Sequence, residues 1–301
     1  MIETFQAELP HGITLSCRAS GPAGAPVLMF LHGFPEAAFV WDELLERFAT
    51  RYRCVAPNLR GFEKSSSPKE PEAYRVKHLV ADLEALIAKV SPGAPLEALV
   101  AHDWGGAVAW TLAAQRPQVM KRLVIVNSPH PATFLRELKS NPLQQAASAY
   151  MNFLCRPDAE ALLAADDFRR MWPMFTNMGA ADTARNGGGW LTPQVRDQYR
   201  AVWSAGLTGG CNYYRASPLR PPTSPDDAIM KLEFTPEFVT VNVPTLVIWA
   251  EDDSALPPAL IDGLEAYIPR MRLVRVPGAT HWIVHEQPAL VAGEIERELA
   301  A

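Results

Sequence analysis

The stretch that decides the fold is Leu99-Val100-Ala101-His102-Asp103-Trp104-Gly105-Gly106-Ala107. An apolar run typical of a buried strand ends in one acidic residue, Asp103, and a segment with helical spacing follows. Small residues flank this acid on both sides: Ala101, Gly105 and Gly106. A sharp strand-to-helix turn requires such residues because the two backbones approach closely there. The stretch therefore predicts a nucleophile elbow that presents an aspartate where G-x-S-x-G enzymes present a serine.

An aspartate at this position changes the chemistry that the elbow can perform. A carboxylate with a reference pKa of about 3.9 is already anionic and needs no base before it attacks. Its natural target is an electrophilic sp³ carbon, displaced in line to give an enzyme ester. That ester must then be hydrolysed by an activated water. The alternative interpretation of Asp103 is a helix N-cap, but capping alone does not require small residues on both sides.

A base and an acid that could activate this water follow in the chain order expected after such a nucleophile. Val247–Asp253 predicts a strand running into an acidic loop, and Gly278–Trp282 follows the last apolar strand. Asp253 would fix the tautomer of His281, and His281 would deprotonate the water. A solvated loop explains the run of carboxylates better than a metal site, because no second ligand cluster accompanies it. Two neighbouring acids are rivals for the orienting role: Glu251 and Asp252.

An early loop predicts the remaining part of the site. Phe30–Glu36 ends an apolar strand, and in this arrangement the loop turns a backbone N–H, that of Phe34, towards the nucleophile. Together with the N–H of Trp104 it would form an oxyanion hole for the ester-hydrolysis step. The other histidines near these motifs indicate backbone-orienting or structural roles: His32, His102 and His285.

Outward from the elbow, short apolar runs alternate with amphipathic stretches in residues 1–130 and again after residue 228. This rhythm predicts an α/β fold, a mostly parallel central sheet with helices on both faces. Residues 131–227 show only helical or irregular patterns and interrupt the rhythm. We expect a core of residues 1–130 and 228–301 and a helical cap of residues 131–227 over the carboxyl ends of the strands, where open sheets bind ligands.

Composition excludes several other classes of protein. The 301 residues include 48% hydrophobic and 20% charged residues, which predicts a large buried core. A formal charge of −5 argues against a nucleic-acid partner. No run approaches the roughly 18 apolar residues of a membrane span, and Met1–Gly21 does not read as a signal peptide. Four dispersed cysteines without C-x-x-C spacing favour the reducing cytoplasm.

Together these motifs resemble the α/β-hydrolase superfamily over essentially the whole chain, and within it the Asp-nucleophile epoxide hydrolases. Asn212-Tyr213-Tyr214-Arg215 looks like the cap motif whose tyrosine directly before Arg binds the epoxide oxygen. Tyr150-Met151-Asn152-Phe153 looks like the segment that supplies a second tyrosine. The resemblance implies the pair Tyr150 and Tyr214, with Tyr213 as a competitor of Tyr214. The other pieces that match are His32–Glu36, Arg60-Gly61, His102–Gly106, Asp253 and His281.

The reaction implied by the resemblance opens a small hydrophobic epoxide with water to a vicinal diol, without a metal or organic cofactor. The paired phenols have an independent chemical reason, because the alkoxide that forms is a poor leaving group unless a donor stabilises it. In one loop the chain departs from many relatives, with Asn58 and Glu63 where they carry Asp and Gly. We expect altered packing there and no loss of chemistry.

Three alternatives stay open from the sequence. Haloalkane and haloacid dehalogenases share the Asp–His–acid set, but many of them place Asn after His-Gly, where this chain has Phe34. Fluoroacetate dehalogenases are also similar but carry Arg where this chain has Trp104. A binding protein could use the same scaffold to hold a hydrophobic ligand without turnover. The oligomeric state is not determined by these patterns.

Overall fold

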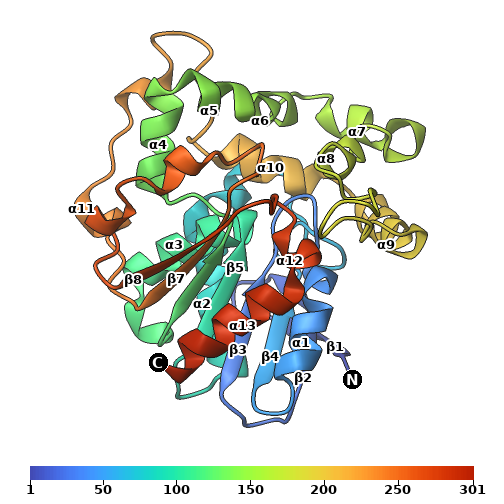
Figure 1. Ribbon diagram of the computed structural model, residues 1–301, viewed down its shortest axis with the longest axis vertical. Coiled ribbons are helices and arrows are strands. Elements are labelled where there is room, and N and C mark those ends of the chain that lie inside the picture. The colour runs from blue at the N-terminus through green and yellow to red at the C-terminus, as the bar shows by residue number, and fades with distance from the viewer.

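A computed structural model describes residues 1–301 and contains one eight-stranded sheet (Figure 1). Its spatial order is β1-β2-β4-β3-β5-β6-β7-β8. The pairs β1/β2 and β2/β4 are antiparallel, and every other pair is parallel. The predicted fold class is therefore confirmed. The strands are β1 (Glu3–Glu8), β2 (Thr14–Ser20), β3 (Val27–Leu31), β4 (Arg53–Pro57), β5 (Ala98–His102), β6 (Leu123–Val126), β7 (Thr245–Ala250) and β8 (Met271–Val276).

Two helical layers cover the faces of the sheet, which explains the continuous apolar runs of its strands. Leu28 and Phe30 of β3 belong to the cluster that includes α1 and α13, whereas Met29 and Leu31 belong to the cluster that includes α2 and α3. Each strand thus buries alternate side chains in two different cores. The helices of these layers are α1 (Asp42–Phe48), α2 (Val76–Val90), α3 (Asp103–Gln115), α12 (Ile283–Glu286) and α13 (Pro288–Ala300).

Between β6 and β7 the chain forms no strand, and its helices lie above the sheet in Figure 1. We infer that residues 131–227 form the cap and that the rest forms the core. Just after this segment, α11 (Pro236–Val239) already contacts α3 of the core. The cap helices are α4 (Pro131–Ser140), α5 (Pro142–Ala147), α6 (Ala149–Leu154), α7 (Ala159–Phe168), α8 (Pro173–Thr176), α9 (Pro193–Ser204) and α10 (Thr208–Ala216).

Two elements differ from the pattern-based expectation. The edge strand β1 was not predicted, because only Ala7 of its six residues is buried and the rest carry no apolar alternation. Leu256–Tyr267, one of the stretches in the strand–helix rhythm predicted after residue 228, forms two short 3₁₀ helices, Pro258–Ile261 and Leu264–Ala266, in place of one continuous helix. Gly263 separates them at φ +80°, a left-handed backbone conformation that an α-helix cannot contain.

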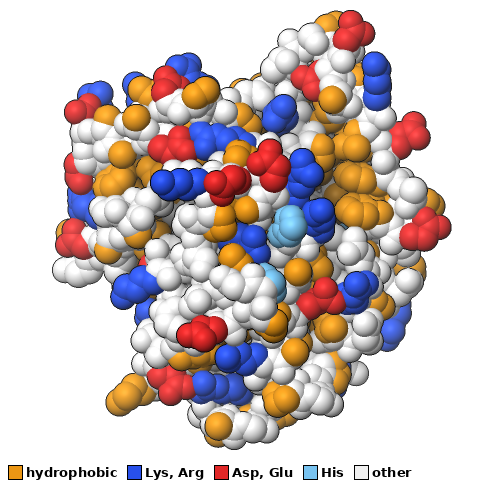
Figure 2. Space-filling model, turned by 180° about the vertical axis from the view of Figure 1, so that it is seen from behind, with side chains coloured by type: hydrophobic (Ala, Val, Ile, Leu, Met, Phe, Trp, Pro, Cys, Tyr) orange, Lys and Arg blue, Asp and Glu red, His pale blue; other side chains and the backbone are white.

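The surface shows charges of both signs mixed with apolar side chains, and one view of it is given in Figure 2. Blue and red side chains alternate across that face without forming a continuous basic stripe. The four cysteines are free thiols. Every helix is too short or too polar to cross a bilayer.

Candidate active site

The elbow has the strained geometry that its small neighbours suggested. Asp103 begins α3 with φ +48°, a left-handed conformation that a side-chain-bearing residue rarely adopts. A Cβ on Gly105 would lie 2.6 Å from the carbonyl oxygen of His32, and one on Gly106 would lie 2.3 Å from Cβ of Ser128. The prediction that this turn requires small residues is confirmed by these distances. The Ser128 hydroxyl fastens the turn by donating to the carbonyl of Asp103 at 2.7 Å.

His281 and Asp253 meet behind the elbow. Nδ1 of His281 lies 2.6 Å from Oδ2 of Asp253, and Nε2 of His281 lies 3.8 Å from Oδ2 of Asp103. Asp253 is fully enclosed, and its other oxygen accepts the N–H groups of Ala255 and Leu256 at 2.8 and 3.0 Å. The two rival acids do not reach the histidine: Glu251 pairs with Arg275, and Asp252 is exposed.

Nearby carboxylates set the charge of His281. Burial by itself would lower the pKa of this imidazole, but the charge and hydrogen bond of Asp253, with the charges of Asp103 and Glu36, outweigh it and raise the pKa to about 9. In the resting protein at neutral pH the imidazole is therefore protonated. Any change that neutralises Asp103 removes one of the charges that hold this proton.

The two oxygens of the Asp103 carboxylate have different surroundings. Oδ1 accepts the backbone N–H of Phe34 at 2.7 Å. Oδ2 has no hydrogen-bond donor and faces His281. The predicted second donor, the N–H of Trp104, lies in the first turn of α3, where helix N–H groups lack intrahelical acceptors. A Cβ on Gly33 would lie 2.0 Å from Oδ1, so this loop position also requires glycine.

Three cap tyrosines lie near this carboxylate with different hydrogen bonding. The rings of Tyr150 and Tyr214 have centroids 5.9 Å apart, and both residues line the same cavities as Asp103. The hydroxyl of Tyr213 instead donates to the carbonyl of Arg60 at 3.0 Å. Burial raises the pKa of Tyr150 and Tyr214, and the charge of Asp103 raises it further, so both phenols keep their protons.

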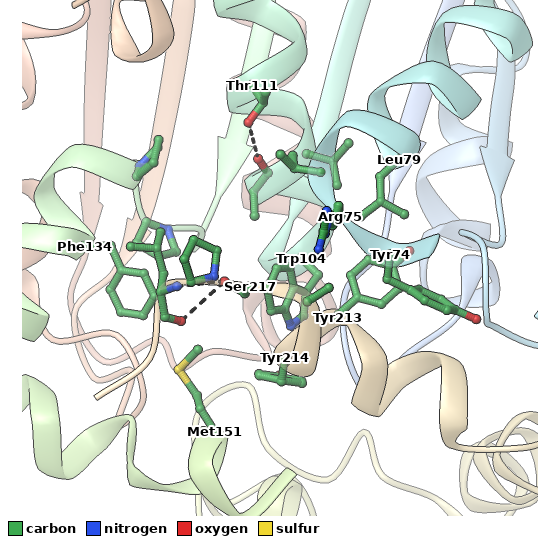
Figure 3. A pocket seen from close by; sticks show the side chains of 18 of the residues that line it. Tyr74, Arg75, Leu79, Trp104, Thr111, Phe134, Met151, Tyr213, Tyr214 and Ser217 are labelled. Atoms are coloured by element: carbon green, nitrogen blue, oxygen red, sulfur yellow. Dashed lines mark hydrogen bonds between the residues drawn. The ribbon is translucent and has the colours of Figure 1, made fainter. Parts of the chain in front are cut away.

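Two chambers meet at Asp103, Tyr150 and Tyr214. The first, which we call the apolar chamber, has a volume of about 300 Å³, and 16 of its 23 lining residues are hydrophobic. Figure 3 shows this chamber, with Trp104 and Tyr214 near its centre. The second, the mixed chamber, has a volume of about 280 Å³ and is lined by His281 and by cap residues around α8. A molecule at Asp103 can therefore extend substituents in two directions.

Sequence reasoning missed one residue that holds the orienting acid. Asn127 follows β6 with φ +40°, and its amide donates to Oδ2 of Asp253 at 2.8 Å. Its carbonyl oxygen accepts the N–H of Ala250 at 2.6 Å, which ties β6 to β7. A signal was present, because a polar residue directly after a buried strand lies at the edge where open sheets bind ligands.

The sequence assigned Glu36 no role beyond its place at the end of the loop motif. In the structure this carboxylate is buried, with 1% of the residue exposed. Its Oε1 accepts from the hydroxyl of Tyr199 in cap helix α9 at 2.8 Å and lies 2.9 Å from Nε2 of His285. Its Oε2 lies 3.3 Å from Nδ1 of His102, whose Nε2 lies 2.9 Å from the carbonyl oxygen of His281. His102 thus positions the backbone of His281, as predicted, and Glu36 joins His102 and His285 to the cap.

The loop that departs from the family pattern is held by hydrogen bonds of its two unusual residues, Asn58 and Glu63. Asn58 donates to Oε2 of Glu63 at 2.7 Å and accepts the N–H of Ala38 at 2.8 Å. Glu63 adopts φ +50°, a conformation natural for glycine. The Asn58–Glu63 hydrogen bond stabilises this turn, and the altered packing relative to relatives stays a prediction.

Fold and site together define an α/β-hydrolase with a carboxylate at the nucleophile elbow, and a family profile described as the alpha/beta hydrolase fold matches residues 26–288. Epoxide hydrolase 4 of Mus musculus is 30% identical over 94% of this chain and 76% of its own length. The chain therefore belongs to the epoxide hydrolase family of α/β-hydrolases.

Two further comparisons cover nearly the whole chain. The AB hydrolase superfamily protein YfhM of Bacillus subtilis is 32% identical over 93% of this chain and 92% of its own length. The crystal structure of Bacillus megaterium epoxide hydrolase with an inhibitor superposes with a TM-score of 0.88 and 28% identity. It covers 99% of this chain and 100% of its own.

Proposed function

We propose that this protein hydrolyses epoxides to vicinal diols through a covalent ester on Asp103. The single observation that carries the proposal is the arrangement of Asp103, which has one oxygen on the N–H of Phe34 and the other without a hydrogen bond, 3.8 Å from Nε2 of His281. Two protonated phenols on the cap and a histidine–aspartate pair on the core lie on either side of it. A nucleophile, a proton donor and a water-activating base therefore converge on one small volume.

In the first step Oδ2 of Asp103 attacks one ring carbon, and the C–O bond to that carbon breaks. The leaving oxygen takes a proton from the Tyr150–Tyr214 pair, which leaves one phenolate. These phenols suit the task because burial keeps them protonated while the ring oxygen is still neutral. Tyr213 is not used, because its hydroxyl is engaged by Arg60.

Formation of the ester discharges Asp103, which prepares the second step. One of the three carboxylate charges that raise the pKa of His281 is lost, so this pKa falls and the imidazole releases its proton to the phenolate through solvent. His281 then acts as a neutral base and removes a proton from the attacking water. Asp253, held by Asn127, compensates the imidazolium that forms.

The tetrahedral intermediate carries its negative charge on the oxygen that rests on the N–H of Phe34, with the N–H of Trp104 as the second donor. In its collapse the bond between the Asp103 carbonyl carbon and the alkyl oxygen breaks, and the hydroxyl that came from water passes its proton to the departing oxygen, which restores the carboxylate and releases the diol. The sum is one epoxide and one water consumed and one diol formed, with the His281 proton restored.

The test combines diol formation with detection of the ester. Wild-type protein should convert styrene oxide to its diol, and Asp103→Ala should not. His281→Gln should form the ester and stall, and intact-mass spectrometry should then show an adduct equal to the mass of the substrate.

Two results would contradict the proposal. Halide release from haloalkanes without diol formation would assign the dehalogenase reaction. Affinity for epoxides with neither product would leave a binding protein.

A further inference from the structure

We propose that Arg170 makes the mixed chamber a binding site for a carboxylate, so that the preferred substrates are epoxides with an anionic group at the end of one substituent. This inference rests on the proposed function, because it names the substrate class of that same site. Arg170 lines the mixed chamber at its exposed side, whereas Asp103 lies at its junction with the apolar chamber. Arg170 would therefore act as a specificity-determining residue and would not touch the epoxide ring.

Arg170 differs from the other arginines of the cap. Of the nine in residues 131–227 it alone makes no hydrogen bond, ion pair or aromatic contact within the protein. Cap arginines are otherwise engaged by a carboxylate, a carbonyl oxygen, a thiol or an aromatic ring: Arg136, Arg156, Arg169, Arg185, Arg196, Arg200, Arg215 and Arg220. A guanidinium without a partner keeps its full capacity for two parallel hydrogen bonds to a carboxylate.

The polar groups at the exposed side of the mixed chamber favour an anion. At its inner end His281 lies between the carboxylates of Asp253 and Asp103, so its charge is already compensated, and Arg170 is the lining cation that remains free to bind an anion. The amide of Asn177 also lines this chamber and has no side-chain partner. The lining of the same chamber also includes the apolar side chain of Met174, which suits a methylene chain. The chamber therefore matches an apolar spacer that ends in a hydrogen-bond-accepting anion.

An unusual backbone turn precedes Arg170. Asp166, Asp167 and Phe168 adopt φ of 54°, 55° and 58°, a left-handed turn made entirely of residues other than glycine. Such a turn is disfavoured for L-residues and persists only where its surroundings hold it. Here Arg200 pairs with Asp167 at 2.8 Å, and Phe168 packs on Trp203 with centroids 5.4 Å apart.

The consequence of this turn is positional. The chain reverses its helical sense after Ala165 and returns to right-handed geometry at Arg169, directly before Arg170. The carboxylates of the turn are paired with other arginines, Arg169 and Arg200, and so do not neutralise Arg170. The turn thus places an uncompensated cation at the chamber.

The opposite chamber supplies the matched control. Arg75 lines the apolar chamber, is exposed and also lacks an ion-pair partner. Its surroundings differ, because most of that lining is apolar and accommodates a hydrocarbon substituent. Arg170→Gln and Arg75→Gln therefore make the same charge change at the two arms of one cavity.

The experiment compares terminal epoxides that carry a carboxylate on a chain of increasing length with their methyl esters. For the wild type we expect the ratio of kcat/KM for acid over ester to reach a maximum at one chain length. Arg170→Gln should lower this ratio about fivefold, mainly through KM, and Arg75→Gln should leave it unchanged. High salt should reduce the wild-type preference, because the contact is partly exposed.

Three outcomes would overturn the inference: an acid preference that Arg170→Gln leaves intact, the same loss in both variants, or a loss in Arg75→Gln alone. Calorimetric binding of the saturated carboxylic acid, which has no ring to open, separates this site from the reaction. Weaker binding to Arg170→Gln with no turnover of styrene oxide by the wild type would refute the proposed function and keep the carboxylate site. Turnover of styrene oxide, together with equal binding of the acid by wild type and Arg170→Gln, would refute the carboxylate site and keep the proposed function.

Discussion

The two neighbouring tyrosines of α10 provide a sharp test, because one substitution chemistry should have opposite consequences at adjacent positions. Tyr214→Phe removes a phenol that faces Asp103 across the cavity, whereas Tyr213→Phe removes a hydroxyl whose partner is the carbonyl of Arg60. Both rings remain, so the aromatic packing on Trp104 is retained in each variant.

The magnitudes follow from what each hydroxyl does. Loss of one donor to a developing oxyanion typically costs a factor of about 10² to 10³ in kcat. We expect the lower value for Tyr214→Phe, because Tyr150 still faces the leaving oxygen. Tyr213→Phe should lose one neutral hydrogen bond, about 1 kcal/mol of stability, which lowers Tm by roughly 1–2 °C in a chain of this length.

The assay is single-turnover formation of the ester, quenched at intervals and followed by intact mass, together with thermal unfolding. Ester formation should be slow in Tyr214→Phe and near normal in Tyr213→Phe, while the loss in Tm should follow the reverse order. Equal rate losses in the two variants, or a larger loss in Tyr213→Phe, would refute the assignment of the epoxide oxygen to Tyr214.

Three other substitutions or conditions test the rest of the site. His281 must be neutral to act as a base, and its pKa is raised to about 9 only while Asp103 is charged. Hydrolysis of the ester should therefore accelerate as pH rises from about 6, with a midpoint below 9. Stopped-flow measurements in which decay of the ester slows with rising pH would contradict this. Gly33→Ala would place Cβ 2.0 Å from Oδ1 of Asp103, so kcat should fall about 100-fold through displacement of the carboxylate, and an unchanged kcat would show that the loop yields. Asn127→Ala removes hydrogen bonds to Asp253 and to the β7 backbone, which should destabilise the fold by about 1–3 kcal/mol and slow ester hydrolysis more than ester formation. Urea unfolding measures the loss of stability, and single-turnover experiments measure the two rates. A variant as stable as the wild type would refute the structural role.

The sequence was most informative where local geometry restricts residue type. The elbow is the strongest case, since Gly105 and Gly106 are recognisable from their spacing and their Cβ positions in the structure have no room. Strand β3 is a second case, because its burial on both faces produces a continuous apolar run. Strand β1 was missed because an exposed edge strand needs no apolar pattern.

Contacts between distant segments could not be obtained in this way. The choice of Tyr214 over Tyr213 depends on the carbonyl of Arg60, more than 150 positions earlier in the chain, which occupies one of two adjacent hydroxyls. Asn127 is one of many asparagines until the sheet brings it beside Asp253. No spacing rule relates such pairs, because their separation along the chain is set by the lengths of loops and helices between them.

What the sequence by itself determined is therefore the α/β fold class, the aspartate at the elbow, and the order of acid and histidine, each of which depends on neighbouring residues or on strand order. Tertiary structure alone decided the remaining features: which cap phenol is unengaged, how Asp253 and Asp103 raise the pKa of His281, and that Arg170 alone among the cap arginines lacks a partner. The physical reason is that hydrogen bonds and charge interactions act over a few ångströms in space. Only the folded chain establishes which groups lie within that range.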